Sequence, residues 1–393
     1  MESVLSPENR KTQARGSAIK VVSVALAHMF HDVFSTMIAT LLPVFIEQFQ
    51  ISTFMAGVMP VLVRAPSIFQ PVFGRIADRK DVRWFLIALP TLTAFFMTMT
   101  GVVKTYFGVL ILLILTGLSA ALFHTVGAPA AGKFAGKKIG RALGMWMIGA
   151  RIGAAISPIL VVSTIGLLTL RGLPILTLLG LVSSLFLYSQ FKKEPIYLSS
   201  TTKSASIKDS WKIVRPIMLP LLAISLAQSF LGILYTTYLP TFLTQNGSPL
   251  WIAGVALTLF SIAGIPASYL GGTLSDKIGR KKIFLVSAVM TVLLNFCFLA
   301  FQGWLSAIFI ILIGFSSFLV TPLPMSFVQT AFPEMRSYAN GMYVGTTFFL
   351  RSFALLLVGL LSDYFGMRVL YVVFAFVFLI SIPIIIFKLP ESA

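Results

Sequence analysis

Long apolar segments and short polar stretches alternate along the whole chain. A helix needs about 20 predominantly apolar residues to cross the hydrocarbon core of a bilayer, and each segment is close to that length or longer. The pattern therefore predicts an all-α integral membrane protein with twelve transmembrane helices. The predicted spans are residues 18–46, 54–77, 84–103, 106–131, 141–164, 171–191, 215–243, 249–274, 283–301, 304–331, 339–361 and 367–388.

The second half of the chain repeats the first. Four residues of the first span recur 197 positions later: Thr40, Pro43, Phe45 and Gln48 are matched by Thr237, Pro240, Phe242 and Gln245. Gly74 and Asp78 recur 198 positions later as Gly272 and Asp276. Because the register holds across a half-chain, we expect two pseudo-symmetric bundles of six helices in the same orientation, an arrangement that places a substrate site near the midplane between the halves.

The polar stretches set the predicted boundaries of these bundles. Within the polar segment that joins them, Ile207, Trp211 and Val214 have the spacing of an amphipathic helix. A short interfacial helix and a solvated linker both fit this segment. The predicted divisions are a tail at 1–17, a bundle at 18–191, a linker at 192–214, a bundle at 215–388 and a tail at 389–393.

The composition excludes a soluble protein. Hydrophobic residues make up 57% of the chain and charged residues only 11%, whereas soluble domains carry about 25% charged residues. The net charge of +18 would indicate a nucleic-acid partner in a soluble protein. The single cysteine, Cys297, permits neither a disulfide framework nor a thiolate metal site.

The distribution of Lys and Arg accounts for the net charge. Of these 30 residues, 24 fall in the tails and in the loops on one side, and the loops on the other side hold Lys104, Arg171 and Arg368. Cytoplasmic loops are enriched in Lys and Arg, so both termini are predicted to be cytoplasmic. The positive charge is therefore assigned to topology, and no nucleic-acid partner is predicted.

The first span carries an unusual group of ionisable residues. His28, His31 and Asp32 share one face of a helix by their spacing. Apart from Glu47, near the end of the same span, Asp32 is the only acid inside a predicted span. A charge at this depth costs about 2.5–3.5 kcal/mol on insertion scales, so such residues usually line a cavity and serve a function. We expect these three residues to bind the coupling proton, although His28 also fits a buried structural role.

Three arginines lie near the centres of other spans: Arg64, Arg151 and Arg351. With the histidines neutral, the three arginines and Asp32 sum to +2. A positive site of low dielectric favours an anion, which arginine can bind through two parallel hydrogen bonds. Arg64 and Arg151 also fit a structural role as hydrogen-bond donors or partners of Asp32. The remaining candidate substrate ligands are His124, which equally fits a structural role, and Gln228, Tyr235, Tyr238 and Tyr343.

A loop motif carries a resemblance to a known family. The stretch from Gly272 to Lys282 resembles the cytoplasmic-loop motif of the major facilitator superfamily, and the first-half copy has Asp81 in place of the later glycine. The stretch from Gly144 to Pro158 resembles the antiporter motif of that superfamily, with Val161 and Val162 in place of its glycine pair. The resemblance implies secondary active transport by alternating access. The implied conformational-switch residues are Gly74, Asp78, Arg79, Gly272, Asp276, Lys277, Gly279, Arg280, Gly153 and Pro158.

A narrower resemblance implies a substrate class. The residues that carry it are His28, His31, Asp32, Pro43, Gln70, Pro71, Phe123, His124 and Pro129. They are similar to the fosmidomycin-resistance-type branch, whose members are bacterial proton-coupled drug exporters. The resemblance implies a multi-pass protein of the prokaryotic inner membrane, with protons and a small organic molecule as partners.

Other function classes lack their motifs. The chain has no G-x4-G-K-[ST] stretch and no H-E-x-x-H stretch, which disfavours an ATP-driven pump and a metalloenzyme. We predict no enzyme activity, no cofactor, no metal and a monomeric state. The leading prediction is a proton-coupled exporter of a small or amphipathic anionic compound. An importer or facilitator of organic anions, a lysolipid flippase and a non-transporting sensor stay open as alternatives.

Overall fold

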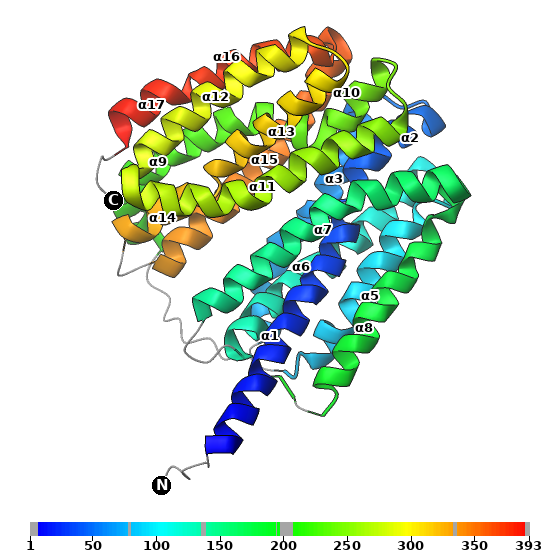
Figure 1. Cartoon of the computed structure of the whole chain (residues 1–393), viewed down its shortest axis with the longest axis vertical. Helices are drawn as coiled ribbons and strands as arrows, with labels where there is room; N and C mark the ends of the chain where they lie inside the picture. Colours follow the sequence, from blue (N-terminus) through cyan, green and yellow to red (C-terminus); the bar gives the residue numbers. More distant parts are fainter. Residues whose placement is uncertain are drawn as a thin grey trace. The chain divides into compact units, whose positions relative to one another are not determined.

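The computed structural model describes residues 7–77, 80–134, 139–193, 195–196, 207–332 and 336–389. Within these ranges the regular secondary structure is helical and contains no strand (Figure 1). Ten helical segments of the described residues are long and apolar enough to cross a membrane. Two shorter apolar helices, Thr53–Phe69 and Arg83–Met99, occupy the positions of the second and third predicted spans. The predicted all-α architecture of twelve apolar segments is confirmed.

The helices agree with the predicted spans to within a few residues at most ends. In the first half they are α1 (Pro7–Ser35), α2 (Ile38–Phe49), α3 (Thr53–Arg64), η1 (Ala65–Phe69), α4 (Gln70–Ala77), α5 (Arg83–Met99), α6 (Tyr106–Phe134), α7 (Ile139–Leu168), η2 (Leu170–Leu176) and α8 (Thr177–Phe191). In the second half they are α9 (Ile207–Ile233), η3 (Leu234–Tyr238), α10 (Leu239–Gln245), α11 (Leu250–Ile278), α12 (Arg280–Ala300), α13 (Trp304–Leu319), α14 (Leu323–Ala331), α15 (Arg336–Phe365), α16 (Met367–Leu379) and α17 (Ser381–Lys388).

The end of the predicted linker does not form a separate helix. Residues 207–214 are the first turns of α9, which continues without interruption into the seventh span. The amphipathic spacing of Ile207, Trp211 and Val214 is therefore part of a long helix, and neither a short interfacial helix nor an irregular linker describes this stretch.

Spans 1 and 7 are interrupted at equivalent places. Between α1 and α2 the chain makes a turn at Thr36 and Met37, and in the second half a turn of π-helix, η3, joins α9 to α10. Each interruption comes shortly before the repeated proline, Pro43 or Pro240. Proline lacks the backbone N–H and clashes with the preceding turn, which favours irregular helix geometry nearby.

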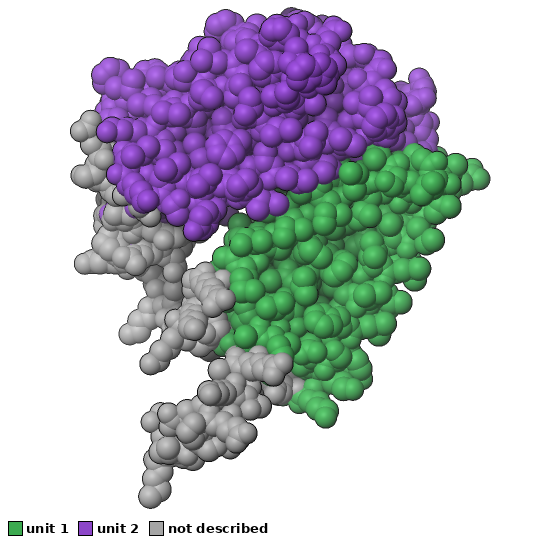
Figure 2. All heavy atoms as spheres, viewed as in Figure 1, with its two compact units in different colours: residues 1–37, 62–201 green, residues 38–61, 202–393 purple. Residues whose placement is uncertain are grey.

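The described chain forms two compact units (Figure 2). Unit 1 comprises residues 1–37 and 62–201, and unit 2 comprises residues 38–61 and 202–393. The hairpin of α2 and the start of α3, residues 38–61, thus contacts the helices of the second half more than those of the first.

Close packing of α7 against α1 positions the most polar helix of unit 1. A Cβ atom on Gly149 would meet the carbonyl oxygen of Ala25, and one on Gly153 would meet that of Met29. One turn further along, the Ser157 hydroxyl donates a hydrogen bond of 2.5 Å to the Val33 carbonyl oxygen. Small residues at every fourth position let two helix backbones touch, so this face of α7 fixes the height and rotation of α1.

Asp81, which replaces a glycine of the loop motif, has a structural role in unit 1. Its Oδ1 accepts hydrogen bonds from the backbone N–H groups of Ile196 at 2.9 Å and of Arg83 at 3.1 Å. Its Oδ2 lies 2.8 Å from Arg83 Nε. Asp81 therefore caps the start of α5 and ties it to the chain segment that follows α8.

Candidate functional site

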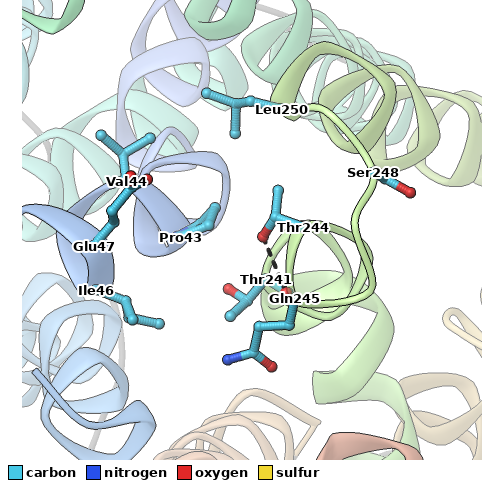
Figure 3. Close-up of a pocket in the computed structure, with 9 residues that line it drawn as sticks. All are labelled: Pro43, Val44, Ile46, Glu47, Thr241, Thr244, Gln245, Ser248 and Leu250. Carbon is cyan, nitrogen blue, oxygen red and sulfur yellow. Dashed lines mark hydrogen bonds between the residues drawn. The ribbon is translucent and has the colours of Figure 1, made fainter. Parts of the chain in front are cut away.

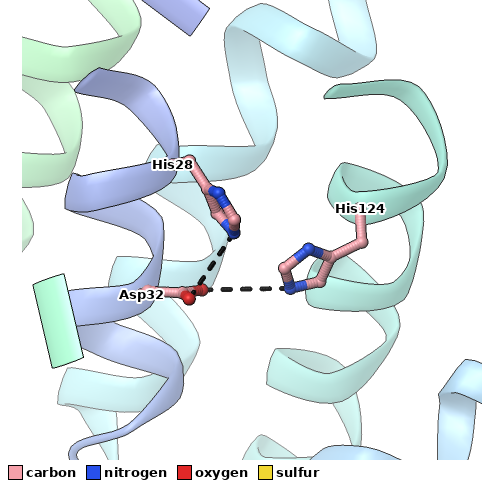
Figure 4. A group of neighbouring side chains, drawn as sticks. All are labelled: His28, Asp32 and His124. Carbon is pink, nitrogen blue, oxygen red and sulfur yellow. Dashed lines mark ion pairs between the residues drawn. The ribbon is translucent and has the colours of Figure 1, made fainter. Parts of the chain in front are cut away.

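The ionisable residues of the first span meet His124 inside unit 1. His28 and Asp32 lie one turn apart on α1, and His124 points toward them from α6 (Figure 4). His28 Nε2 is 3.5 Å from Asp32 Oδ2, and His124 Nε2 is 3.9 Å from Asp32 Oδ1. The side chain of Asp32 is 15% exposed and that of His124 is 37% exposed, whereas His28 is almost fully buried. The structure thus gathers a carboxylate and two imidazoles around one small space.

His31 and Ser35 hold the carboxylate of Asp32. His31 Nδ1 lies 3.0 Å from Asp32 Oδ1, and because a carboxylate only accepts, His31 donates through Nδ1–H. The Ser35 hydroxyl donates to the same oxygen at 3.1 Å. The second oxygen, Oδ2, is left facing His28. His31 is therefore placed to orient the acid.

The tautomer of His28 follows from one hydrogen bond. Its Nδ1 is 2.8 Å from the carbonyl oxygen of Trp146 on α7, so Nδ1 must carry a hydrogen. Nε2 is buried and has no hydrogen-bond partner among the described residues. In a neutral imidazole this Nε2 is a lone pair, and it faces the carboxylate oxygen of Asp32 at 3.5 Å. Two acceptors face each other, an arrangement that a proton or another cation between them would stabilise.

Two aromatic side chains hold the imidazole rings. The ring of His28 stacks on Trp146 with centroids 3.7 Å apart, and that of His31 stacks on Phe123 with centroids 4.4 Å apart. A Cβ atom on Gly127 would meet the Trp146 indole, so this glycine makes room for the ring. Trp146 is not among the site residues predicted from the sequence. No spacing along the chain could have paired it with His28, which is 118 residues away.

Two of the three predicted arginines lie near this cluster. Arg64, at the end of α3, and Arg151, on α7, both interact electrostatically with Asp32. Arg351 belongs to unit 2, where it donates a hydrogen bond of 3.2 Å to the hydroxyl of Thr236 in η3. The structure therefore places two arginines and one acid together in unit 1.

The hydroxyl groups of the predicted tyrosine ligands are hydrogen-bonded inside unit 2. Tyr235 is 1% exposed and its hydroxyl donates to Asn295 Oδ1 at 2.7 Å, while Tyr238 is fully buried with its hydroxyl on the Leu355 carbonyl at 3.3 Å. Tyr343 is 8% exposed and shares a hydrogen bond of 2.7 Å with Ser225. Because their hydroxyl groups are used within unit 2, these residues stabilise helix packing. The Gln228 amide nitrogen is buried and has no hydrogen-bond partner among the described residues.

The first glycines of the two loop motifs, Gly74 and Gly272, have open space around them. Among the described residues, a Cβ on Gly272 would have no neighbour within 4 Å, whereas one on Gly271 would meet the backbone of Leu319. Gly74 likewise has room, because its nearest neighbour is a methyl group of Thr125 at 3.9 Å. Helix crossing geometry decides which of two adjacent glycines faces the partner helix.

The other predicted switch residues lie near the junction of α11 and α12, on α7, or outside the described residues. Gly279 has a φ of +95° between α11 and α12, a conformation that favours glycine. The Arg280 guanidinium lies over the Phe327 ring with 5.6 Å to its centroid, and Lys277 lies at the end of α11. Pro158 lies on α7 beside Ser157. Asp78 and Arg79 fall outside the described residues, as does the side chain of Asp276.

A cavity of about 390 Å³ lies in unit 2 between α2 and α10 (Figure 3). These helices carry the repeated Pro43 and Pro240 segments, so the cavity is lined by equivalent parts of the two halves. Its lining residues are Pro43, Val44, Ile46, Glu47, Thr241, Thr244, Gln245, Ser248 and Leu250. Glu47 is its only ionisable residue.

The comparisons with known proteins agree with this architecture. The sequence profile of the Major Facilitator Superfamily matches residues 24–334 and 248–393. The chain is 25% identical to the fosmidomycin resistance protein of Escherichia coli (strain K12) over 386 residues, which cover 93% of this chain and 91% of that protein. It is 27% identical to the multidrug resistance protein MdtG of Enterobacter lignolyticus (strain SCF1) over 237 residues, which cover 58% and 56%.

A solved structure shows the same fold. The bacterial homologue of the human lysosomal transporter Spinster, in an inward-facing and unoccupied conformation, superimposes with a TM-score of 0.79 at 12% identity, covering 94% of this chain and 96% of that chain. The long apolar helices and this superposition show the all-helical fold of a multi-pass membrane protein. The chain belongs to the major facilitator superfamily, and its relatives include proteins of the drug-resistance type.

Proposed function

We propose that this transporter exports a small or amphipathic anionic compound in exchange for protons. The observation that supports proton coupling is the pair of facing acceptors, His28 Nε2 and Asp32 Oδ2, at 3.5 Å. A proton that binds between them converts a repulsive contact into a charge-assisted hydrogen bond, and its release restores the repulsion. Such a group exchanges a proton readily and is sensitive to the charge of a nearby substrate.

The coupling test uses purified protein in proteoliposomes that contain a pH-sensitive dye. Asp32→Asn keeps the shape of the side chain and removes the charge, so we expect substrate-driven pH changes to disappear while the protein stays folded. Glu47→Gln is the matched control, because it neutralises the other acid of the first span, and coupling should persist. Undiminished proton movement in Asp32→Asn combined with His28→Ala would contradict the proposal.

The arginines near the cluster support an anionic substrate. Two arginines, Arg64 and Arg151, interact with the single acid Asp32, so these three residues carry a net positive charge. Arginine binds carboxylates and phosphonates through paired hydrogen bonds. We expect Arg151→Gln and Arg64→Gln each to reduce transport of anionic solutes by about tenfold or more, the loss typical of one charged hydrogen bond. Arg351→Gln tests the contribution of unit 2. Transport of anions that survives all three substitutions, or faster transport of cations than anions in the wild type, would overturn this part.

Alternating access requires contacts that form and break, and the hairpin at residues 38–61 supplies candidates. Asp363 at the end of α15 accepts hydrogen bonds from the backbone N–H groups of Thr53 at 2.7 Å and Phe54 at 2.9 Å. The carboxylate thus caps the start of α3. Gly359 allows the close approach, because a Cβ there would meet the Thr53 carbonyl oxygen at 3.0 Å. We propose that release of this cap accompanies opening of the transporter on the side of the membrane opposite the termini.

The release of the cap is testable by accessibility. Loss of a helix cap costs about 0.5–2 kcal/mol. Asp363→Ala should therefore increase the labelling rate of Thr241→Cys or Ser248→Cys, made in a Cys297→Ser background and probed from outside intact cells. Asp363→Asn keeps one acceptor and should give a smaller increase. Unchanged labelling in both variants would contradict the role of this contact.

Direction, location and oligomeric state complete the proposal. The concentration of Lys and Arg on one side supports cytoplasmic termini in the bacterial inner membrane. Export predicts that cells lacking the transporter accumulate more of the substrate than cells that express it, and import predicts the reverse. We propose a monomer as the working unit, and the mass of the detergent-solubilised protein tests it.

A further inference from the structure

The same cluster has the donor set of a metal site. We propose that His28, Asp32 and His124 bind a divalent transition-metal cation, with Zn²⁺ the best fit, and that this cation competes with the coupling proton. The inference deepens the proposed function because it uses the same side chains, but its test does not depend on transport. The three residues offer one ligand atom each, and these atoms all lie within 4.8 Å of one another.

The distances fit a site that closes on the metal. Zinc is bound at about 2.0–2.2 Å by His nitrogen and carboxylate oxygen, which puts tetrahedral ligands about 3.3 Å apart. His28 Nε2 is 3.5 Å from Asp32 Oδ2, close to that value, whereas His124 Nε2 is 3.9 Å from the other carboxylate oxygen, Oδ1. The His124 side chain is less buried than that of His28, and metal binding requires its ring to move toward the carboxylate.

The supporting hydrogen bonds are those that metal ligands use. A ligating histidine almost always donates its other ring N–H to a carbonyl or carboxylate, and His28 donates Nδ1–H to the Trp146 carbonyl at 2.8 Å. This bond aims the Nε2 lone pair at the site. The acid is held in the same way, because His31 and Ser35 both donate to its Oδ1. The buried Nε2 of His28 has no hydrogen-bond partner among the described residues, and its lone pair is free to bind a cation.

The choice of metal follows from the ligand types. Imidazole nitrogen suits zinc, copper, nickel and iron, whereas magnesium and calcium prefer oxygen ligands. Three protein ligands leave a fourth position of a tetrahedral ion open, which is typical of exchangeable zinc. The ligands come from α1 and α6, so a bound ion would tie these helices together.

Nearby charges set the expected strength of binding. Arg64 and Arg151 interact with Asp32 and oppose a second positive charge, so binding should be weaker than at a structural zinc site. The ligands must be deprotonated to bind a metal, so affinity must fall as the pH is lowered. Arg64→Gln should therefore increase zinc affinity, although the same substitution is expected to weaken the binding of an anion.

The test is metal binding to the purified full-length protein in detergent, without a polyhistidine tag. Isothermal titration with Zn²⁺ should give one site per chain at neutral pH, with affinity reduced at least about tenfold one pH unit lower. Titration with Co²⁺ should give the intense visible absorption of a four-coordinate ion. His28→Ala, His124→Ala and Asp32→Asn should each weaken binding by about tenfold or more. Asp32→Asn is nearly isosteric and guards against loss of binding through misfolding.

The outcomes separate this inference from the proposed function. Absence of zinc binding in the wild type, or equal binding in wild type, His124→Ala and Asp32→Asn, overturns the metal site. Zinc binding with these mutational effects supports it whether or not proton coupling is found. If both hold, Zn²⁺ should inhibit substrate-driven proton movement in proteoliposomes, and the inhibition should weaken at lower pH.

Discussion

In each half of this transporter the first and fifth spans meet at an equivalent place, but the side chains at the contact differ. In unit 1, His28 on α1 bonds to the backbone of Trp146 on α7. In unit 2 the residues 197 positions later, Ser225 on α9 and Tyr343 on α15, share a hydrogen bond of 2.7 Å. The repeat therefore conserves a point of contact between the first and fifth spans of each half. Only in unit 1 does that contact involve a histidine.

The residues that pack the two helices together around this contact also differ between the halves. Gly149, Gly153 and Ser157 bring α7 against the backbone of α1, and their counterparts on α15 are Thr346, Leu350 and Ala354. Thr346 and Leu350 are larger than the glycines they correspond to, and α15 packs less closely on α9 than α7 does on α1. The residues after His28 also change, because His31 and Asp32 are replaced by Gln228 and Ser229, whose hydroxyl bonds to its own helix at the Ser225 carbonyl. In unit 1 the ionisable residues thus lie on a helix, α1, that packs closely against α7.

The largest effect should come from breaking this close packing of α1 against α7. Gly153→Leu forces a side chain into the Met29 carbonyl and must separate α1 from α7, which costs more than the about 1–3 kcal/mol of ordinary overpacking. We expect little folded protein by fluorescence-detected size exclusion. Gly144→Ala is the matched control, since a Cβ there would meet no described atom within 4 Å, and it should leave the yield unchanged. Normal yield and melting temperature for Gly153→Leu would show that the packing has no such importance.

The next effect should come from giving unit 1 the chemistry of unit 2. His28→Ser replaces the imidazole by the residue found at the equivalent place in unit 2. General acid or base groups contribute about 10²–10⁴ in rate, so proton-coupled transport should fall by about a hundredfold. The control at the equivalent position, Ser225→Ala, removes a hydroxyl but no titratable group, and coupling should persist. Equal losses in the two variants would show that the halves do not divide the roles as we propose.

The smallest effect should come from Tyr343→Phe. It removes the hydroxyl that bonds to Ser225 and keeps the ring, so we expect a loss of about 1 kcal/mol in stability, the usual contribution of one hydrogen bond. A decrease of a few degrees in melting temperature with unchanged substrate affinity would mark Tyr343 as a packing residue. A large change in substrate affinity with an unchanged melting temperature would instead restore the sequence-based prediction that it is a substrate ligand.

The candidate site was predictable only where it is local. His28 and Asp32 are one helical turn apart, so their shared face follows from the period of the helix. His124 was singled out as an ionisable residue inside a span, but nothing in the sequence placed it against Asp32. Tyr235 and Tyr238 are predicted as substrate ligands from the sequence, and only the structure shows that their hydroxyl groups bond to Asn295 and to the Leu355 carbonyl inside unit 2.

The sequence by itself determined the apolar segments, the half-chain repeat and the group His28, His31 and Asp32, because each depends on residues that are neighbours along the chain. Tertiary structure decided the rest. In the tertiary structure, Gly271 and not Gly272 packs closely against a neighbouring helix. The hydrogen bond to the Trp146 carbonyl sets the tautomer of His28. The hairpin at residues 38–61 belongs to the same compact unit as the second half. These features depend on where helices far apart in the sequence cross, and a side chain's hydrogen-bond partners are set by that crossing.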